Sequence, residues 1–424
     1  MKEIFEERER AILVGVERPD TPWPTSASLD ELARLVDTAG ADVVGRTIQK
    51  LERPNPRTFI GSGKVKEVAD MIHAYAADIV VFDDELTPSQ QANLEKSVDR
   101  TVKVIDRTAL ILDIFALHAT TKEGRLQVRL AQNQYLYPRL RGMWAHLASN
   151  RMGGGVGSRF GEGESQLEVD RRMVRKRITS IRRELAHLEQ VRAVQRVERY
   201  RSGIFKVALA GYTNAGKSSL INALCDADVL SYDKLFATLD STTRQLKLPE
   251  GREVTLTDTV GFIRTLPTTL VEAFKSTLDE INGANLILHV VDASSEEHGY
   301  HMQAVEEVLD QIGAASIERV EVFNKCDLLD DGQREALRIA YPDAVLVSAA
   351  TGDGLDALIR RIGDSAASRD VLLNVLIPYS RGDLVALAHK RCQVLSEQYE
   401  EEGTHLTLRT SLEFKHSFEP FETR

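Results

Sequence analysis

A glycine-rich loop with the pattern GxxxxGK[ST] lies between an apolar run at residues 206–210, which predicts a β-strand, and a run from Leu220 that predicts a helix. Backbone N–H groups of such a loop point at phosphate oxygens, and the helix N-terminus adds a favourable dipole. We therefore predict a nucleotide-phosphate site, in which Lys217 neutralises β- and γ-phosphate charge and Ser218 binds Mg²⁺. The loop consists of Gly211, Tyr212, Thr213, Asn214, Ala215, Gly216, Lys217 and Ser218.

A second motif follows the strand predicted at residues 320–323 and consists of Asn324, Lys325, Cys326 and Asp327. The Asp327 carboxylate can accept hydrogen bonds from N1–H and the exocyclic amine of guanine, which adenine does not present together. Leaving that carboxylate unmatched in a desolvated pocket is costly, so the motif predicts guanine rather than adenine nucleotides. A further strand-end loop holds Ser348, Ala349 and Ala350, and we expect the Ala349 N–H to donate to guanine O6.

Between these motifs a DxxG element, formed by Asp258, Thr259, Val260 and Gly261, ends another predicted strand. We expect Asp258 to hold Mg²⁺ through a water and the Gly261 amide to sense the γ-phosphate. Magnesium also needs a threonine from an upstream loop, and Thr238, Thr242 and Thr243 are the candidates. The ordered elements are similar to the translation-factor class of small GTPases.

Two further residues bear on the rate of GTP hydrolysis. Phe262 follows DxxG, where many small GTPases have a glutamine that orients the attacking water. Phenylalanine cannot orient water by hydrogen bonding, so we predict slow intrinsic hydrolysis unless a partner or another side chain positions the water. Asn214 lies where some related GTPases coordinate K⁺ with an asparagine, and bonding to the loop backbone is an equal alternative.

The elements that must position these motifs divide the 424 residues into four predicted domains. Residues 1–120 predict a small α/β domain with a parallel sheet, with strands at 11–16, 42–49, 79–82 and 102–105 and helices at 28–39, 64–76 and 88–97. Residues 121–201 predict a long antiparallel helical hairpin. Residues 202–366 predict a doubly wound, mostly parallel sheet, with strands at 206–210, 253–257, 286–291, 320–323 and 344–347. Residues 367–424 predict a small α+β tail, with strands at 372–377 and 405–409 and a helix at 383–396.

The predicted hairpin is basic although the chain has a net charge of −10. Residues 121–201 hold 18 Lys and Arg against 8 Asp and Glu, a net of +10 that leaves −20 for the rest. Its second arm has apolar residues at 4-3-4-3 spacing, typical of a coiled-coil seam, namely Val174, Ile178, Ile181, Leu185 and Leu188. The arginines at 171, 172, 175, 177, 182 and 183 fall largely on the remaining surface. This pattern favours nucleic-acid phosphate contacts, and an ordinary charged, solvated surface is the alternative.

Bulk composition narrows the class of protein further. Hydrophobic residues make up 42% and charged residues 28%, which is typical of folded globular proteins. No apolar stretch reaches the length of a membrane span, and residues 1–10 lack the apolar core of a secretory signal. The three cysteines form no CxxC pair, which argues against a zinc ribbon or disulfide framework. We expect a cytoplasmic protein with reduced thiols, acting as a monomer.

Several segments resemble the HflX family of ribosome-associated GTPases. The resemblance covers nearly the whole chain and includes residues 49–67, with Pro54-Asn55-Pro56, residues 126–132 and 166–172, and residues 236–240 and 258–263. The sequence departs from the family at residues 159–165, where the family typically shows R-G-P-G-E-T, and at Arg129, where it usually has Glu.

The resemblance implies hydrolysis of GTP coupled to binding of the large ribosomal subunit and its RNA, with separation or rescue of stalled ribosomes under stress. It selects Thr238 as the Mg²⁺-binding threonine, within a nucleotide-binding segment of Phe236, Ala237, Thr238, Leu239 and Asp240. We expect the glycine-rich tip at residues 153–163 to contact ribosomal RNA, with a plain connector as the alternative. A second nucleotide near Gly61-Ser62-Gly63-Lys64 is a weaker hypothesis than a structural turn. Two other functions stay open: a GTP-dependent switch acting on a protein or membrane, and an RNA-remodelling ATPase that uses the N-terminal domain.

Overall fold

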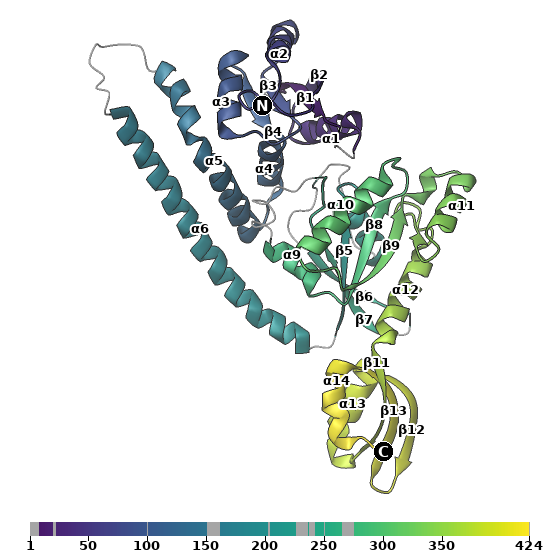
Figure 1. Cartoon of the computed structure of the whole chain (residues 1–424). Helices are drawn as coiled ribbons and strands as arrows, with labels where there is room; N and C mark the ends of the chain where they lie inside the picture. Colours follow the sequence, from purple (N-terminus) through teal and green to yellow (C-terminus); the bar gives the residue numbers. More distant parts are fainter. Residues whose placement is uncertain are drawn as a thin grey trace, which may run out of the picture. The chain divides into compact units, whose positions relative to one another are not determined.

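The structure is a computed structural model that describes residues 8–19, 23–99, 101–150, 162–201, 204–225, 236, 242–249, 251–264 and 275–423. The chain divides into two compact units. The first comprises Met1–Leu188, Tyr232–Asp240 and Thr265–Lys275, and the second comprises Glu189–Ser231, Ser241–Arg264 and Ser276–Arg424. Most elements of both units are labelled in Figure 1.

The first unit contains a four-stranded parallel sheet with strand order β2-β1-β3-β4. All four predicted strands are confirmed, as β1 (Arg10–Glu17), β2 (Asp42–Lys50), β3 (Ile79–Phe82) and β4 (Lys103–Asp106). The predicted helices are α1 (Thr25–Thr38), α2 (Ser62–Tyr75) and α3 (Pro88–Ser97). A further helix, α4 (Arg107–His118), was not predicted. Its N-cap is Asp106, whose side chain accepts a hydrogen bond from the Ala109 N–H.

Helices cover both faces of this sheet, which explains why its central strands are apolar almost throughout. On one face, Val14 and Phe82 pack with Val68 of α2 and Leu94 of α3. On the other, α1 contributes buried residues that include Leu32. The carboxyl ends of the strands are thereby held at one edge.

The predicted hairpin consists of α5 (Lys122–Asn150) and α6 (Glu162–Arg201), which run in opposite directions in Figure 1. The five residues with 4-3-4-3 spacing are half-buried, whereas the residues between them on α6 are exposed, so the predicted apolar face is confirmed. Arg171 and Arg175 place their guanidinium groups 5.8 and 5.3 Å from the ring centre of Tyr137 on α5. The predicted tip lies outside the described residues up to Gly161.

The second unit contains a six-stranded sheet with order β10-β9-β8-β5-β7-β6. The predicted strands are present as β5 (Phe205–Gly211), β7 (Glu253–Asp258), β8 (Leu286–Asp292), β9 (Glu318–Asn324) and β10 (Val345–Leu346), all parallel. An edge strand that was not predicted, β6 (Thr242–Lys247), pairs antiparallel with β7. The helices are α7 (Lys217–Cys225), α9 (Lys275–Asn282), α10 (His298–Gln311), α11 (Asp331–Ala340) and α12 (Leu355–Ser368).

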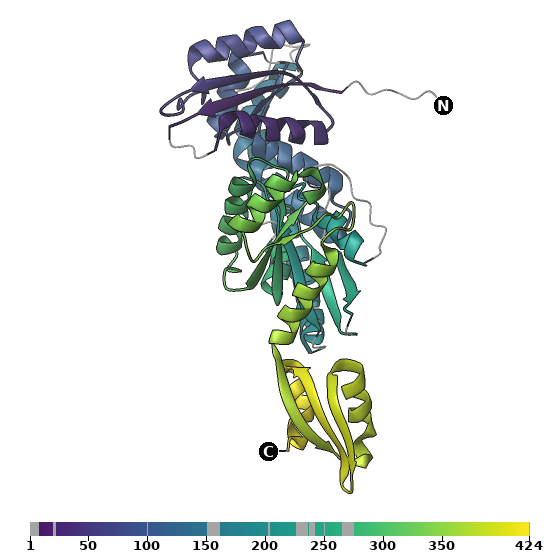
Figure 2. The same cartoon turned by 90° about the vertical axis from the view of Figure 1, so that its right-hand side faces the viewer.

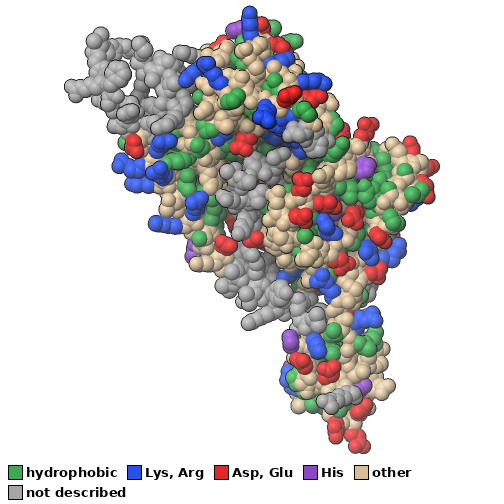
Figure 3. Space-filling view, in the orientation of Figure 1, with side chains coloured by type: hydrophobic (Ala, Val, Ile, Leu, Met, Phe, Trp, Pro, Cys, Tyr) green, Lys and Arg blue, Asp and Glu red, His purple; other side chains and the backbone are tan. Residues whose placement is uncertain are grey.

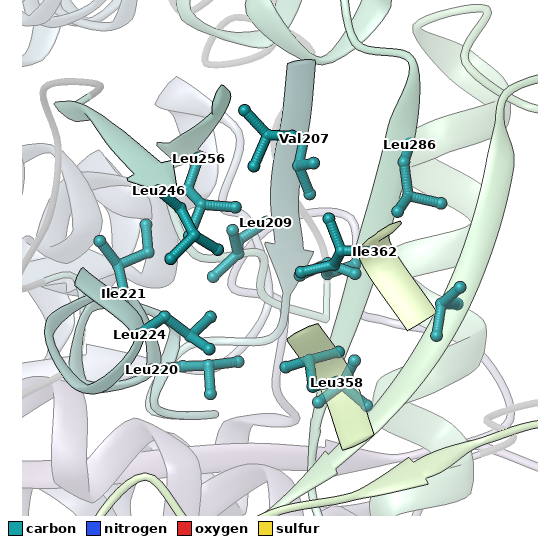
Figure 4. Close-up of a cluster of buried hydrophobic side chains, with 14 of the residues drawn as sticks. Val207, Leu209, Leu220, Ile221, Leu224, Leu246, Leu256, Leu286, Leu358 and Ile362 are labelled. Carbon is teal, nitrogen blue, oxygen red and sulfur yellow. The ribbon is translucent and has the colours of Figure 1, made fainter. Parts of the chain in front are cut away.

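The main core of this sheet lies beneath α7 and α12 (Figure 4). Leu209 and Leu256 of the strands point toward Leu220 of α7, and Leu358 and Ile362 of α12 complete the cluster. Burial of such a side chain contributes roughly 1.5–3 kcal/mol. This packing fixes where β5 ends and α7 begins, which is where the glycine-rich loop lies.

The C-terminal part of the second unit forms a three-stranded antiparallel sheet, visible in Figure 2, with order β11-β13-β12. Its elements are β11 (Asp370–Ile377), α13 (Gly382–Arg391), β12 (Gln393–Glu400), β13 (Gly403–Ser411) and α14 (Leu412–Phe418). The prediction of one helix through residue 396 was wrong, because residues 393–400 form a strand. Pairing with β13 outweighs the local helix propensity of that segment. Among the residues that the structure describes, no helix is long and apolar enough to cross a membrane.

Candidate nucleotide-binding site

The glycine-rich loop connects the end of β5 to the start of α7, as the sequence predicts. Gly211 passes so close to β8 that a Cβ atom there would lie 2.2 Å from the Val290 carbonyl oxygen. Gly216 has φ +85°, and a Cβ on it would lie 2.2 Å from Asn324 Nδ2. Asn214 also has positive φ, +62°. Glycine is therefore required at both ends of the turn, where the backbone passes neighbouring strands.

Lys217 is buried and its ammonium group lies against the loop. Its Nζ donates to the carbonyl oxygens of Gly211 and Tyr212, at 3.0 and 2.9 Å. Burial lowers the pKa of Lys217 to about 8, and the nearby Asp258 carboxylate acts in the opposite direction. A desolvated cation at the mouth of a phosphate loop gains stability when phosphate charge is added.

The Ser218 hydroxyl and the Asp258 carboxylate meet beside the loop. Ser218 Oγ donates to Asp258 Oδ2 at 2.6 Å, and Asp258, the last residue of β7, is buried. Hydroxyl and carboxylate oxygens are ligands that Mg²⁺ prefers, so this pair fits the magnesium ion that P-loop GTPases generally use with GTP or GDP.

The rest of the DxxG element lies directly against the loop. Thr259 Oγ1 donates to the Leu209 carbonyl oxygen at 2.6 Å. A Cβ on Gly261 would lie 3.0 Å from Thr213 Cα and 3.1 Å from Lys217 Nζ. Phe262 is 1% exposed, so its side chain packs in the interior. At the position where many GTPases have glutamine, this chain buries an apolar ring.

Asn324 joins the NKxD motif to two other loops. Its Nδ2 donates to the Ala215 carbonyl oxygen at 2.9 Å, and its Oδ1 accepts from the Ala349 N–H at 3.0 Å. The Ala349 amide, expected on guanine O6, thus contacts Asn324 in this structure. Ser348 is fully buried, and its Oγ accepts from the Thr351 N–H at 3.1 Å. These bonds bring three of the predicted segments together at the carboxyl edge of the sheet.

The other residues of the NKxD motif differ in exposure. Lys325 has φ +64°, and its Nζ forms an ion pair with Asp292 Oδ2 at 2.7 Å. Asp292, at the end of β8, was not singled out from the sequence, although a carboxylate at a strand end is a recognisable signal. Burial raises the pKa of the Cys326 thiol. Asp327, by contrast, is exposed.

The predicted switch segment is described only at Phe236, which belongs to the first unit. Its ring is buried and meets Phe115 of α4 edge to face, with ring centres 4.6 Å apart, and its φ is +59°. Ala237, Thr238, Leu239 and Asp240 lie outside the described residues. Of the competing threonines, Thr243 is in β6 and its Oγ1 lies 3.1 Å from Thr257 Oγ1.

The turn at Gly61 to Lys64, considered for a second nucleotide, is bonded to neighbouring elements. The Gly61 N–H donates to Gln49 Oε1 at 2.9 Å. Lys64 Nζ lies 3.1 Å from Thr47 Oγ1 and pairs with Glu67 at 2.8 Å. These contacts account for the turn as a structural feature of α2.

Comparison with known proteins covers almost the whole chain. Residues 26–116 match a family model described as "GTP-binding GTPase N-terminal", residues 118–199 match "GTP-binding GTPase Middle Region", and residues 206–325 match "50S ribosome-binding GTPase". A crystal structure of a GTP-binding protein from Sulfolobus solfataricus in complex with GDP is 23% identical, with a TM-score of 0.42, covering 85% of this chain and 99% of its own.

Three curated relatives are each named GTPase HflX. The protein from Lacrimispora saccharolytica is 46% identical over 95% of this chain and 93% of its own length. That from Caldanaerobacter subterraneus is 44% identical over 99% and 95%, and that from Escherichia coli is 39% identical over 95% and 94%. Together with the GTPase fold described above, these similarities show that this chain is a GTP hydrolase that belongs to the HflX family.

Proposed function

We propose that this GTPase binds the large ribosomal subunit and couples GTP hydrolysis to separating or rescuing stalled ribosomes under stress. The observation that carries this proposal is the exposed arginine surface of α6. Arg172, Arg175, Arg177, Arg182 and Arg183 are exposed on that helix. The description "50S ribosome-binding GTPase" of the matching domain model supports the same partner.

The α6 surface suits folded RNA because its central stretch, residues 171–183, holds seven Lys and Arg and no Asp or Glu. In Figure 3, blue Lys and Arg side chains gather on the left of the view, the side on which Figure 1 shows α6. Each cation that neutralises a phosphate releases a counterion, so binding should weaken steeply as salt rises. The contacts of Arg171 and Arg175 with Tyr137 hold the two arms of the hairpin together while Arg175 stays exposed.

In the proposed site, the amides of the glycine-rich loop and Lys217 bind the phosphates. Ser218 and Thr238 bind Mg²⁺, and Asp258 acts through a water. Gly261 senses the γ-phosphate, and Asp327 reads guanine. The ring of Phe262 is buried and cannot orient the attacking water, so another group must do so. A bound ribosome would complete the site in this respect.

Cosedimentation with large ribosomal subunits at several salt concentrations, with GDP or a non-hydrolysable GTP analogue, tests the ribosome proposal. In the variant Arg177→Gln/Arg182→Gln/Arg183→Gln, the plot of log affinity against log salt should become shallower, its negative slope shrinking in magnitude by about three. Each lost phosphate contact reduces the magnitude of the slope by about one. A matched control replaces three exposed arginines of the second unit, Arg338, Arg360 and Arg361, by glutamine.

An unchanged salt slope in the α6 variant would contradict the RNA contact and favour the protein- or membrane-directed switch. GTP hydrolysis should be slow in the isolated protein and rise on addition of ribosomes. An equal rate with and without ribosomes would contradict the coupling. Hydrolysis of ATP, stimulated by RNA, would favour the remodelling alternative.

We also propose that K⁺ binds beside Asn214, a residue of the glycine-rich loop that has a positive φ of +62°. A cation there would add positive charge near the phosphates, where other GTPases use an arginine. Hydrolysis rates measured in KCl and NaCl at equal ionic strength, for the parent and for Asn214→Ala, test this. Equal rates in both salts would remove the hypothesis.

A further inference from the structure

The side chain of Tyr212 connects three elements of the GTPase site, beyond what its backbone contributes to the phosphate loop. We propose that Tyr212 is a positioning residue for GTP hydrolysis, which fixes the DxxG segment against the loop through its hydroxyl and its ring. The inference rests on the GTP hydrolase activity alone and is independent of the ribosome as partner.

The backbone on either side of Tyr212 pairs with the DxxG segment. The Thr213 N–H donates to the Phe262 carbonyl oxygen at 2.8 Å, and the Phe262 N–H donates to the Gly211 carbonyl oxygen at 3.1 Å. These two bonds form a parallel bridge between Tyr212 and Phe262. The pairing of β5 with β7 is thus extended beyond the ends of both strands into the two motifs.

The Tyr212 hydroxyl adds a third fixed point further along the segment. It accepts a hydrogen bond from the Arg264 N–H at 2.8 Å, and Tyr212 itself is only 5% exposed. Phe262, which forms the first two bonds, and Ile263, which lies between Phe262 and Arg264, are both fully buried. Gly261 is therefore followed by three residues that cannot shift without breaking a hydrogen bond or exposing an apolar side chain.

A third element holds the tyrosine ring in place. The ring stacks on His301 of α10, with ring centres 4.1 Å apart and planes inclined by 25°. The Tyr212 carbonyl oxygen accepts a hydrogen bond from Lys217 Nζ. One residue thus contacts the phosphate lysine, the exit of the DxxG segment and α10.

These contacts lie on the γ-phosphate side of the site rather than on the guanine side. Gly261 and Lys217 are the groups expected at the γ-phosphate, whereas Asn324 and Asp327 serve the base. A loss of order around Tyr212 should therefore affect the hydrolytic step more than nucleotide binding. The same change should leave the affinity for GDP nearly unaltered, because that affinity depends on the loop amides and on the contacts with the base.

The substitution Tyr212→Phe removes only the hydroxyl and keeps the ring on His301. We expect kcat for GTP to fall about 3- to 10-fold, the effect of one lost hydrogen bond in a positioning network. KM for GTP and Kd for GDP should stay within about twofold. His301→Leu, which removes the stacking ring, should lower kcat in the same direction by a smaller factor.

The matched control is Tyr300→Phe, which removes a hydroxyl from the partly exposed tyrosine next to His301 on the same helix. It should leave kcat unchanged. An unchanged kcat in Tyr212→Phe would overturn the proposal. A fall in GDP affinity and melting temperature in step with kcat would also overturn it, because that pattern indicates a structural role only.

Discussion

Both units place charged side chains at the carboxyl edge of a parallel sheet, but they use them differently. In the first unit, Arg107 follows β4 and lies among buried acids. Its Nε and Nη2 donate to Asp83 Oδ1 at 3.0 and 2.7 Å, and its Nη1 donates to Glu31 Oε2 at 3.0 Å. All three side chains are almost fully buried. These charges satisfy one another inside the protein.

A second buried network stands beside the first, centred on Asp106 of β4. The Asp106 carboxylate accepts from the Leu86 N–H at 3.0 Å, from the Tyr135 hydroxyl at 2.9 Å and from Arg139 at 3.3 Å. Burial raises the pKa of Tyr135, and the Asp106 charge adds to this. Through these bonds α5 is tied to the end of the sheet.

In the second unit the same edge keeps charges that a ligand can engage. Lys217 is buried and donates to two backbone carbonyl oxygens, and within the described part of the chain the Asp258 carboxylate is the negative charge that acts on it. Asp327 is exposed. A polar residue at a strand end therefore does not by itself indicate a binding site, and its existing partners decide whether a ligand can bind there.

The largest effect should come from breaking the network of the first unit. Arg107→Leu leaves Asp83 and Glu31 buried without their cation, so we expect about 3–5 kcal/mol of destabilisation. Urea unfolding followed by tryptophan fluorescence reports this, because both tryptophans, Trp23 and Trp144, belong to the first unit. Arg46→Leu, which breaks an exposed ion pair with Asp30, should cost under about 1 kcal/mol. Equal losses would contradict the distinction.

In the second unit, the substitution Lys217→Ala should damage function rather than folding. We expect kcat/KM for GTP to fall roughly 100- to 1000-fold, because a preorganised positive charge at the phosphates is lost. The melting temperature should not fall, because a buried ammonium with a lowered pKa is costly in the free protein. Lys247→Ala, at an exposed position of β6, is the control. A marked loss of stability in Lys217→Ala would mean that the two edges are alike.

Base selectivity should depend on Asp327. In Asp327→Asn the amide can donate where the carboxylate only accepted, so GTP affinity should fall about 100-fold and xanthosine triphosphate should bind better than GTP. Competition of both nucleotides against a fluorescent GDP analogue measures the change. An unchanged preference for GTP would contradict the assignment of the guanine pocket.

Sequence reasoning recovered the features that are local and missed those that depend on distant residues. The P-loop, DxxG and NKxD motifs are short and each follows an apolar strand, so both the parallel sheet and the candidate site could be predicted. The Arg107 network joins residues 31, 83 and 107, and no sequence period connects them. The contact of Phe236 with Phe115 likewise has no local signal, since an aromatic residue in a polar loop indicates neither its burial nor its partner.

The missed strands have a common physical cause. The strand β6 is an edge strand with a mostly exposed surface, so it lacks the apolar alternation that identified the others. The strand β12 is also an edge strand, and only its pairing with β13 makes it extended. Both are formed by hydrogen bonds to a neighbour rather than by burial of their own side chains.

The smallest expected effect is a pH dependence of nucleotide affinity. It should distinguish Lys217, which can lose its charge, from an ion-paired arginine such as Arg107. Because burial lowers the pKa of Lys217 to about 8, the free protein loses this charge as pH rises above about 8. Bound phosphates favour the charged form, so nucleotide binding at higher pH must take up a proton. Affinity should then fall by up to about tenfold per pH unit above pH 8 and be flat below it. Titration of GDP between pH 7 and 9.5 measures this.

The control for this titration is Lys217→Arg, since a guanidinium stays charged across the whole range. The arginine should weaken binding but flatten the profile. Deprotonation of guanine itself affects both proteins equally, so the difference between their profiles isolates Lys217. The pKa of His289, whose charge would act on Lys217, is lowered to about 4 by burial, so this group titrates outside the range. Parallel profiles for the two proteins would contradict the prediction. They would show that Lys217 keeps its proton in the nucleotide-free protein over the whole pH range.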